Sequence, residues 1–378
     1  MVSVELVQTE QAFQDLRPAW DTILERCASS SIFLTWEWLF TWWVHYQQNR
    51  KLFLILFREK GELQGIAPLF HEEEVRGGIR MRTLRFLGSD GPACSEFLDL
   101  IIAPGYDTEV YQRFGEFLKE RSPLWDRIVL NPLSWGNSEI YRLYRMLNRS
   151  YSAELEEAFR CPYIRLPSDW DQFLVRLSRN FRQQIRTSLR KFEQQTEMRY
   201  LSNAQDIFPV PLLVNTLRTL NGQRMERKGI DSTLKISSFH RFLLDVAEHL
   251  HRRGWLSCSL IQRDQQIAAI IFNFRYGKKV WYYQAGFLPE YAHFRPGTLL
   301  FAQTIREAIE AGFLEYDFLR GEEEYKYRWG SLNRPVTTFR LYNRKLFPQM
   351  IYYFRKAKIR LSGPLKRIYH SIQTHHDS

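Results

Sequence analysis

The chain has 378 residues, of which 44% are hydrophobic and 15% aromatic, and its formal net charge is +11. This composition excludes an intrinsically disordered chain, and the length allows two domains with buried cores. The longest apolar run, 52–57, is far too short for a membrane-spanning helix, and residues 1–11 lack the basic and apolar regions of a signal peptide. We therefore expect a cytoplasmic protein.

In the first half, hydrophobic patterning predicts strands at 2–7, 52–57, 63–70, 82–87, 97–102 and 125–130. Helices are expected at about 9–24, 36–43, 108–119 and 138–147. Four indoles crowd the second of these helices, which Thr35 can cap: Trp36, Trp38, Trp42 and Trp43. They form either a ligand platform or a packing cluster that joins two domains.

The second half is expected to begin near Cys161. One long amphipathic helix is predicted from Trp170, with Ser168 or Asp169 as its cap. Apolar residues recur there at intervals of three or four residues: Phe173, Leu177, Phe181, Ile185, Leu189 and Phe192. Further helices are expected at 212–227 and 237–251, followed by a hairpin of strands at 255–261 and 267–276.

The two halves match each other weakly. In each half, a hairpin is followed by a turn region, a helix and then a strand. This last strand is expected at 125–130 in the first half and at 313–319 in the second. A duplicated α/β (α+β) unit explains this order. We expect domains at 1–160 and 161–345, each a mixed, largely antiparallel sheet flanked by helices, and a basic helical tail at 346–378.

Residues 281–330 are interpreted as a strand, a turn, a helix, a second strand and a polar segment. The helix is predicted over about 299–311, and Gly312 stands where a helix stop is expected. The turn before it leaves backbone N–H groups free at the helix start, and these groups and the helix dipole favour an anion such as phosphate. A plain Pro-Gly turn without a ligand is the alternative.

The same stretch carries a family resemblance. The segments YYQAGF, PEYA, RPGTLL, EYDFLRG and EEYKYRWG, in this order, resemble the C-terminal half of GNAT-fold acetyltransferases of the CelD/BcsL type, relatives of the Fem-type peptidoglycan aminoacyltransferases. The resemblance extends to FLTWEW near the N-terminus and to the basic helix around 178–192, so it spans roughly 30–345. It implies two tandem GNAT-like domains.

The resemblance also implies a donor site. The pyrophosphate of acetyl-CoA, or of another acyl-CoA, would lie at Arg295, Pro296, Gly297, Thr298 and Leu299. Many GNAT enzymes carry Gln/Arg-x-x-Gly-x-Gly/Ala in this loop. Counting from Gly297, this chain has Phe294 and Leu299 at the outer positions, and Arg295 is displaced by one residue. The thioester would point into a cleft between splayed strands, which the acceptor also enters.

Acyl transfer needs a deprotonated acceptor, a stabilised oxyanion and a leaving thiolate. Asp317 is the first candidate for the base because strand alternation separates it from Tyr316 and Phe318, and Glu290 is the second. The alternative for Asp317 is a structural carboxylate paired with an arginine. GNAT enzymes often rely on positioning and water, so no fixed triad is expected.

Substrate contacts are expected from the segment that follows. Tyr325, Lys326 and Arg328 resemble the Lys-containing segment that closes Fem-type acceptor sites, and the two cations suit an anionic group. A surface strand with alternating polar ends is the alternative. Tyr283 and Gln284 are candidates for hydrogen bonds to the acyl chain or the acceptor.

Two clusters hold much of the positive charge. Residues 176–191 include six basic residues and no acid, and residues 341–378 include eight basic residues and one acid. In the first cluster, Arg182 and Arg186 are candidates to grip a phosphorylated acceptor or an RNA backbone, with anionic lipid and a solvated helix face as alternatives. The second cluster suits a helix on an anionic membrane surface, with a helix docked on the protein body as the alternative.

The four cysteines, Cys27, Cys94, Cys161 and Cys258, form no Cys-x-x-Cys pair, so neither a metal site nor a disulfide framework is expected. Residues and resemblance together predict an acyl-CoA-dependent N- or O-acyltransferase that moves an acetyl group to a sugar, a polysaccharide or a cell-envelope precursor. Two alternatives stay open. One is a Fem-type transfer of an aminoacyl group from tRNA, and the other is a non-catalytic adaptor at the inner face of the membrane.

Overall fold

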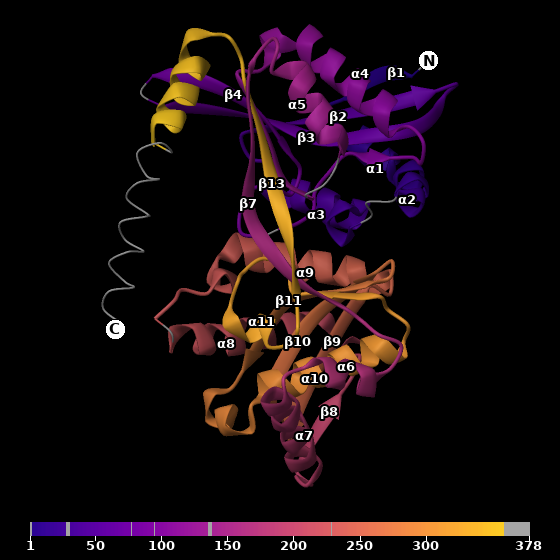
Figure 1. Ribbon diagram of the computed structural model, residues 1–378, viewed down its shortest axis with the longest axis vertical. Coiled ribbons are helices and arrows are strands. Elements are labelled where there is room, and N and C mark those ends of the chain that lie inside the picture. The colour runs from indigo at the N-terminus through magenta and orange to yellow at the C-terminus, as the bar shows by residue number, and fades with distance from the viewer. Residues whose placement is uncertain are drawn as a thin grey trace.

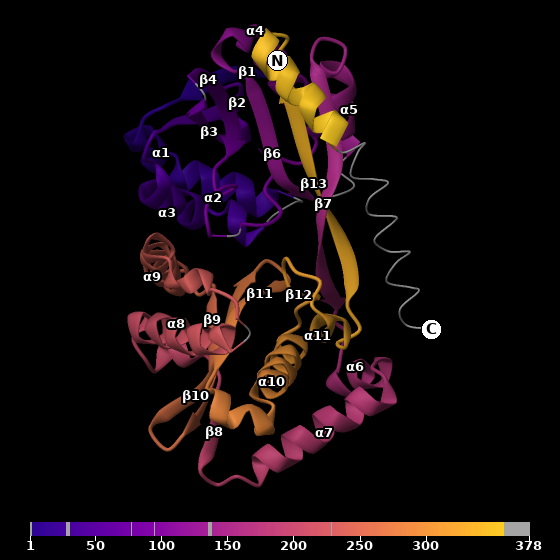
Figure 2. The ribbon, with the colours of Figure 1, turned by 90° about the vertical axis from the view of Figure 1, so that its left-hand side faces the viewer.

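The computed structural model describes residues 2–27, 31–76, 78–93, 95–134, 138–227 and 229–358. Their strands form one thirteen-stranded sheet in the order β1-β2-β3-β4-β6-β13-β7-β12-β11-β10-β9-β8, with β5 paired to β3. The sheet runs through two lobes, each covered by helices (Figures 1 and 2). The predicted fold class, a mixed α/β fold with a largely antiparallel sheet flanked by helices, is confirmed.

The first lobe is built mainly from the N-terminal half of the chain. Its strands pair antiparallel from β1 to β4, and β4 pairs with β6 in parallel. The strands are β1 (Ser3–Val7), β2 (Arg50–Glu59), β3 (Glu62–Arg76), β4 (Ile79–Phe86), β5 (Ile101–Ile102) and β6 (Arg127–Ser134). The helices are α1 (Glu10–Asp15), α2 (Arg17–Arg26), α3 (Trp36–Tyr46), α4 (Asp107–Glu120) and α5 (Ser138–Leu147).

The second lobe carries the stretch around 281–330. Strands β8 to β11 pair antiparallel in sequence order, and β11 pairs with β12 in parallel. The strands are β8 (Met198–Leu201), β9 (Leu256–Arg263), β10 (Gln266–Tyr276), β11 (Lys279–Phe287) and β12 (Glu315–Asp317). The helices are α6 (Trp170–Arg176), α7 (Arg179–Glu193), α8 (Val210–Glu226), α9 (Ser237–Arg252), α10 (Pro296–Glu310) and α11 (Glu324–Tyr327).

A long two-stranded ribbon joins the lobes. Strand β7 (Ser152–Arg165) pairs antiparallel with β13 (Leu332–Tyr342) along the whole length of β13. Strand β13 also pairs with β6 of the first lobe, and β7 pairs with β12 of the second. The domain boundary at residue 160 therefore falls inside a strand, and the division stays a proposal.

Helix α3 brings one of its tryptophans, Trp38, to the contact between the lobes. Trp38 is fully buried, and its ring centroid lies 5.2 Å from that of Phe242 and 5.7 Å from those of Phe274 and Tyr283, all in the second lobe. Trp42 is also fully buried. The structure therefore favours the packing interpretation of this cluster over a ligand platform. Cys27, Cys161 and Cys258 are buried and are not joined in disulfides within the described ranges, and Cys94 lies outside these ranges.

Several predicted elements are wrong. The long helix from Trp170 is two helices, because Ser178 leaves the helical path and its hydroxyl accepts a hydrogen bond from the N–H of Phe181 to cap α7. The first helix of the chain is likewise divided into α1 and α2. The strand expected at 97–102 is reduced to β5, since Phe97 has a positive φ of 53°. Strands β8 and β13 were not expected.

No described helix is long and apolar enough to cross a bilayer. Within the same ranges, no group of three or more His, Cys, Asp and Glu side chains is placed to hold a metal ion.

Candidate functional site

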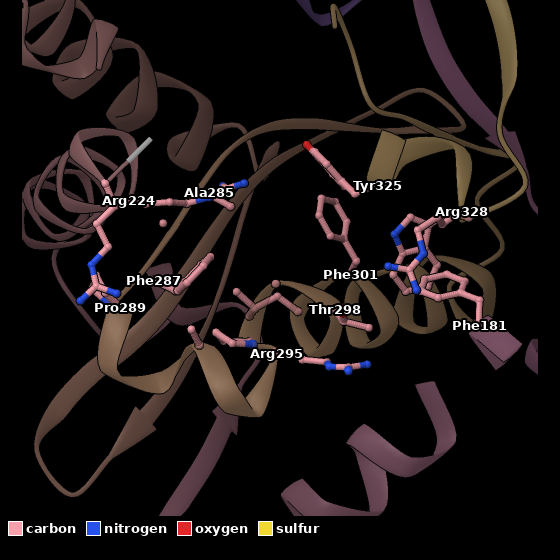
Figure 3. Close-up of a pocket in the computed structure, with 17 residues that line it drawn as sticks. Phe181, Arg224, Ala285, Phe287, Pro289, Arg295, Thr298, Phe301, Tyr325 and Arg328 are labelled. Atoms are coloured by element: carbon pink, nitrogen blue, oxygen red, sulfur yellow. The ribbon is translucent and has the colours of Figure 1, made fainter. Parts of the chain in front are cut away.

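A cavity of about 480 Å³ opens where two parallel strands of the second lobe separate. Strand β11 pairs with β12 only from Lys279 to Trp281, and it then continues to Phe287 without that neighbour. Ala285, Gly286 and Phe287 form one wall of the cavity, and the start of α10 forms another. Figure 3 shows side chains from these two elements, from α8 and from the segment around Tyr325 turned toward this space.

The start of α10 presents free backbone donors to the cavity. Arg295 is its N-cap and adopts a left-handed conformation, with φ and ψ both 53°, and makes no side-chain capping hydrogen bond. Pro296 has no N–H, so the first available donors of the helix are those of Gly297 and Thr298. All four residues line the cavity. Unpaired N–H groups and the helix dipole make this wall suited to an anion.

Gly297 leaves room for a ligand. A Cβ built on this residue meets no atom within 4 Å, and its φ lies in the ordinary negative region. Neither backbone strain nor packing therefore requires glycine at this position. The free space belongs to the cavity, which a larger side chain would fill.

Among the residues that the structure describes, four arginines and no acidic residue line the cavity. Arg224 and Arg227 come from the C-terminal end of α8, and Arg295 and Arg328 from the opposite walls (Figure 3). Arg328 is oriented by two contacts, a hydrogen bond of 2.7 Å to Oε1 of Gln184 and a position 4.4 Å over the ring of Phe181. Such a lining favours a ligand with several negative charges.

The deep wall is aromatic. Phe301 of α10 lies 5.8 Å from Tyr325 and 6.0 Å from Trp329, measured between ring centroids, and all three line the cavity. Burial raises the pKa of Tyr325 far above its usual value, so its hydroxyl stays protonated and able to donate a hydrogen bond. The cavity thus combines a cationic rim with an apolar interior.

Helix α8 is held against β11 by a close backbone approach. A Cβ at Gly286 would lie 2.4 Å from the backbone N of Asn221, so only glycine fits. The side-chain amide of Asn221 donates to the carbonyl of Ala285 at 2.9 Å. This contact fixes the end of α8 that carries Arg224 and Arg227.

Six of the residues expected from the sequence line the cavity together: Arg295, Pro296, Gly297, Thr298, Tyr325 and Arg328. Leu299 is buried and lines a separate space between α7 and the turn before α10. Cavity residues that were not expected from the sequence include Gly286, Arg224, Arg227, Phe301 and Trp329. Helix α8 reaches β11 only through tertiary packing, so no local sequence pattern indicates that the arginines of α8 belong to the site.

Asp317, expected as the base, does not line the cavity. It is fully buried, and its Oδ2 accepts a hydrogen bond of 2.8 Å from Nη1 of Arg334. Burial raises its pKa to about 6, with Arg334 acting in the opposite direction. This geometry is that of the structural alternative, a carboxylate paired with an arginine. Glu290 is exposed on the turn before α10, and a catalytic role for either residue stays a prediction.

Two further substrate candidates, Tyr283 and Lys326, have structural partners. The hydroxyl of Tyr283 donates to the carbonyl of Ala93 at 2.9 Å, across the contact between the lobes. The ammonium of Lys326 is buried and donates to the carbonyls of Arg320 and Gly321, at 2.7 and 3.1 Å.

The remaining candidates also lie outside the cavity lining. Gln284 accepts a hydrogen bond of 3.3 Å from Asn221. Arg182 and Arg186 lie on α7, where Arg182 is partly exposed and Arg186 exposed.

Comparison with known proteins supports the assignment of a transferase domain. Residues 179–327 match the family described as "Acetyltransferase (GNAT) domain". This region holds α7 to α11, and with them every cavity residue named above except Arg328 and Trp329. A search of curated proteins finds no match.

Solved structures with similar folds extend over nearly the whole chain. The crystal structure of FemX is 12% identical in sequence and has a TM-score of 0.63. The match covers 92% of this chain and 99% of the FemX chain. The C-terminal domain of a putative lysylphosphatidylglycerol synthetase from Agrobacterium fabrum is 10% identical, with a TM-score of 0.52, covering 91% and 95%. L-PGS from Bacillus licheniformis is 11% identical, with a TM-score of 0.51, covering 89% and 96%. At these identities the likeness concerns the fold.

Proposed function

We propose that the cavity at the start of α10 binds acyl-CoA and that the protein transfers the acyl group, with acetyl favoured, to an amine or hydroxyl. One observation carries this proposal: a single cavity combines three features. They are the backbone N–H groups of Gly297 and Thr298, four arginine side chains and an apolar interior. The diphosphate of the donor suits the cationic helix start, and its pantetheine arm suits the aromatic wall. The match of residues 179–327 to a GNAT domain supports the same reaction class.

In the reaction, the acceptor nitrogen or oxygen attacks the thioester carbonyl, the carbon–sulfur bond breaks, and the acceptor's proton is balanced by protonation of the leaving thiolate. Tyr325 is the cavity residue suited to donate a hydrogen bond to that sulfur. Within the described part of the chain, no lining residue carries a carboxylate or an imidazole. We therefore propose that the protein positions the two substrates and that water accepts the acceptor's proton. The alternative to be tested is that Asp317 or Glu290 acts as the base.

The acceptor is proposed from the resemblance alone: a sugar, a polysaccharide or a cell-envelope precursor. We place the protein in the cytoplasm, with a peripheral position at the membrane as the further proposal. A CelD/BcsL-type role is likewise a proposal.

Calorimetric titration with acetyl-CoA tests the donor site, with Gly297→Trp as the blocking variant. The open space at Gly297 predicts that the indole fills the cavity and abolishes binding while the fold is kept. Glu310→Trp is the matched control, because Glu310 is exposed at the other end of the same helix. Absence of binding at millimolar acetyl-CoA would overturn the proposal.

The second candidate is transfer of an aminoacyl group from tRNA. It is favoured by the exposure of Arg179, Arg186 and Arg190 on α7, in a stretch without acidic residues. RNA binding that weakens steeply with salt, and that an Arg186→Gln, Arg190→Gln variant reduces, would support it. A non-catalytic adaptor at the membrane is the third candidate, and tight acetyl-CoA binding would remove it.

A further inference from the structure

The helix that follows β13, residues 346–358, is docked on the first lobe by one of its sides. The ring of Tyr352 is mostly buried and lies 5.5 Å from that of Tyr342, centroid to centroid. Arg355 forms an ion pair of 3.0 Å with Glu154 of β7, and the side chain of Gln349 donates to the carbonyl of Asn343 at 2.8 Å. These contacts determine which side of the helix faces outward.

The outward side is apolar. Leu346, Met350, Tyr353 and Phe354 are 80%, 45%, 63% and 71% exposed. Their spacing of four, three and one places them on one side of a helix. Adjacent exposed apolar side chains on one surface mark an interaction site more often than isolated ones do.

The surroundings of this side are basic. From residue 341 to 358 the chain contains no acidic residue, and Arg344, Lys356 and Lys358 are exposed. Two acidic residues next to the helix are already paired with arginines. Glu154 and Glu156 pair with Arg355 of the helix itself, and Glu156 also pairs with Arg340 of β13.

Further cations adjoin the start of the helix. Arg344 donates to the backbone carbonyl of Arg149 at 3.2 Å. Arg149, Lys119 and Arg145 line a surface hollow between α4 and α5, and in the described ranges none of these three forms an ion pair with an acidic residue. Helices α4 and α5 and the docked helix lie at the same end of the molecule in both orientations (Figures 1 and 2).

We infer that this helix is a peripheral docking site for an anionic lipid bilayer. Its four exposed apolar side chains would enter the boundary between headgroups and acyl chains, while the flanking lysines and arginines contact lipid phosphates. An apolar helix side bordered by cations fits this surface in both polarity and charge. Helix α10, whose start lines the cavity, would then lie in the part of the molecule farther from the bilayer (Figure 1).

The test is vesicle flotation of the full chain. Phosphatidylcholine vesicles with and without phosphatidylglycerol are compared, at low and high salt. We expect binding to the anionic vesicles alone, weakened by salt. The Met350→Ser, Phe354→Ser variant should lower the affinity by roughly tenfold or more, because two side chains lose their lipid burial. The Lys356→Gln, Lys358→Gln variant should lower it by about tenfold as well.

A Val175→Ser, Ile207→Ser variant is the matched control, since both side chains are exposed in the second lobe, 68% and 60%. It should bind vesicles as the native chain does, and all three variants should keep the native melting temperature. The inference is overturned if the native chain does not float with anionic vesicles. It is also overturned if the Met350→Ser, Phe354→Ser variant binds the anionic vesicles as strongly as the native chain does. Binding would then depend on charge attraction alone, without insertion of the apolar side chains.

Discussion

At the scale of single residues, two buried carboxylates from different lobes share one charged cluster. Glu96 lies in the loop after β4, and its Oε1 is 3.0 Å from Nε of Arg320. Burial raises the pKa of Glu96 to about 8, against the opposing effect of Arg320, and the nearby Asp317 raises it further. The protonated form of Glu96 is therefore the one that the folded protein accommodates at neutral pH.

Stability should consequently decrease as the pH rises. The pKa of Glu96 is higher in the folded protein than in the unfolded chain, so its favourable contribution is complete below about pH 4.5 and is lost as the pH passes 8. We predict that Glu96→Gln flattens this dependence and is more stable than the native chain above pH 8 by roughly 1–3 kcal/mol. Urea unfolding at several pH values checks this. Equal pH profiles of the two proteins would contradict it.

Asp317→Asn separates a structural from a catalytic role. The substitution leaves the guanidinium of Arg334 without one of its two carboxylate partners, the other being Glu315. We predict a loss of about 2–4 kcal/mol in the free energy of unfolding, with acetyl-CoA affinity unchanged while the protein is folded. Unfolding curves and titrations are measured together. A lost activity with unchanged stability would instead support Asp317 as the base.

At the scale of elements, the site depends on how tightly α8 lies on β11. Gly286 permits the approach, and the arginines at the end of α8 reach the cavity because of it. Gly286→Ala should cost about 1–3 kcal/mol of stability and also weaken acetyl-CoA binding, since α8 must move. Gly297→Ala is the matched comparison, because its Cβ has room and alanine favours the helix by roughly 0.5–1 kcal/mol. Similar stabilities of the two variants would refute the packing argument.

Elements set by local signals were predictable from the sequence. Helix α5 has its predicted bounds, and Gly312, with φ of 73°, follows the end of α10 as expected. The helix itself begins at Pro296, three residues before the predicted start, because a proline at the first turn costs no hydrogen bond. The turn before α10 was expected as an anion site from the same local signal, whereas Tyr325 and Arg328 were expected from the family resemblance.

Features set by distant partners were not predictable. Strand β13 contains Pro335 and several polar residues, and its neighbours β6 and β7 lie far back in the sequence. The break at Ser178 was hidden because Leu177 and Phe181 keep the helical spacing across it. The burial of Asp317 depends on Arg334 and on the first lobe, which no pattern near Asp317 shows.

At the scale of the whole molecule, the continuous sheet predicts that the lobes unfold together. Strands β7 and β13 pair through both lobes, and Trp38 packs on the second lobe from the first. We expect one calorimetric transition, with equal calorimetric and van't Hoff enthalpies. Val336→Asp, which places a charge at a fully buried site of the ribbon, should lower the melting temperature of that whole transition. Two separate transitions in the native chain would contradict this.

The path of the ribbon also sets an order of events during synthesis. Strand β6 ends at Ser134, but its neighbour β13 begins only at Leu332. At typical translation speeds the ribosome needs roughly 10–40 s to cover that interval. Throughout it, β6 lacks the neighbour that completes the first lobe's sheet, and an open strand edge invites pairing with other chains. The nascent chain is therefore most exposed to aggregation before its last strand emerges, and the second lobe must be made before the first can be finished.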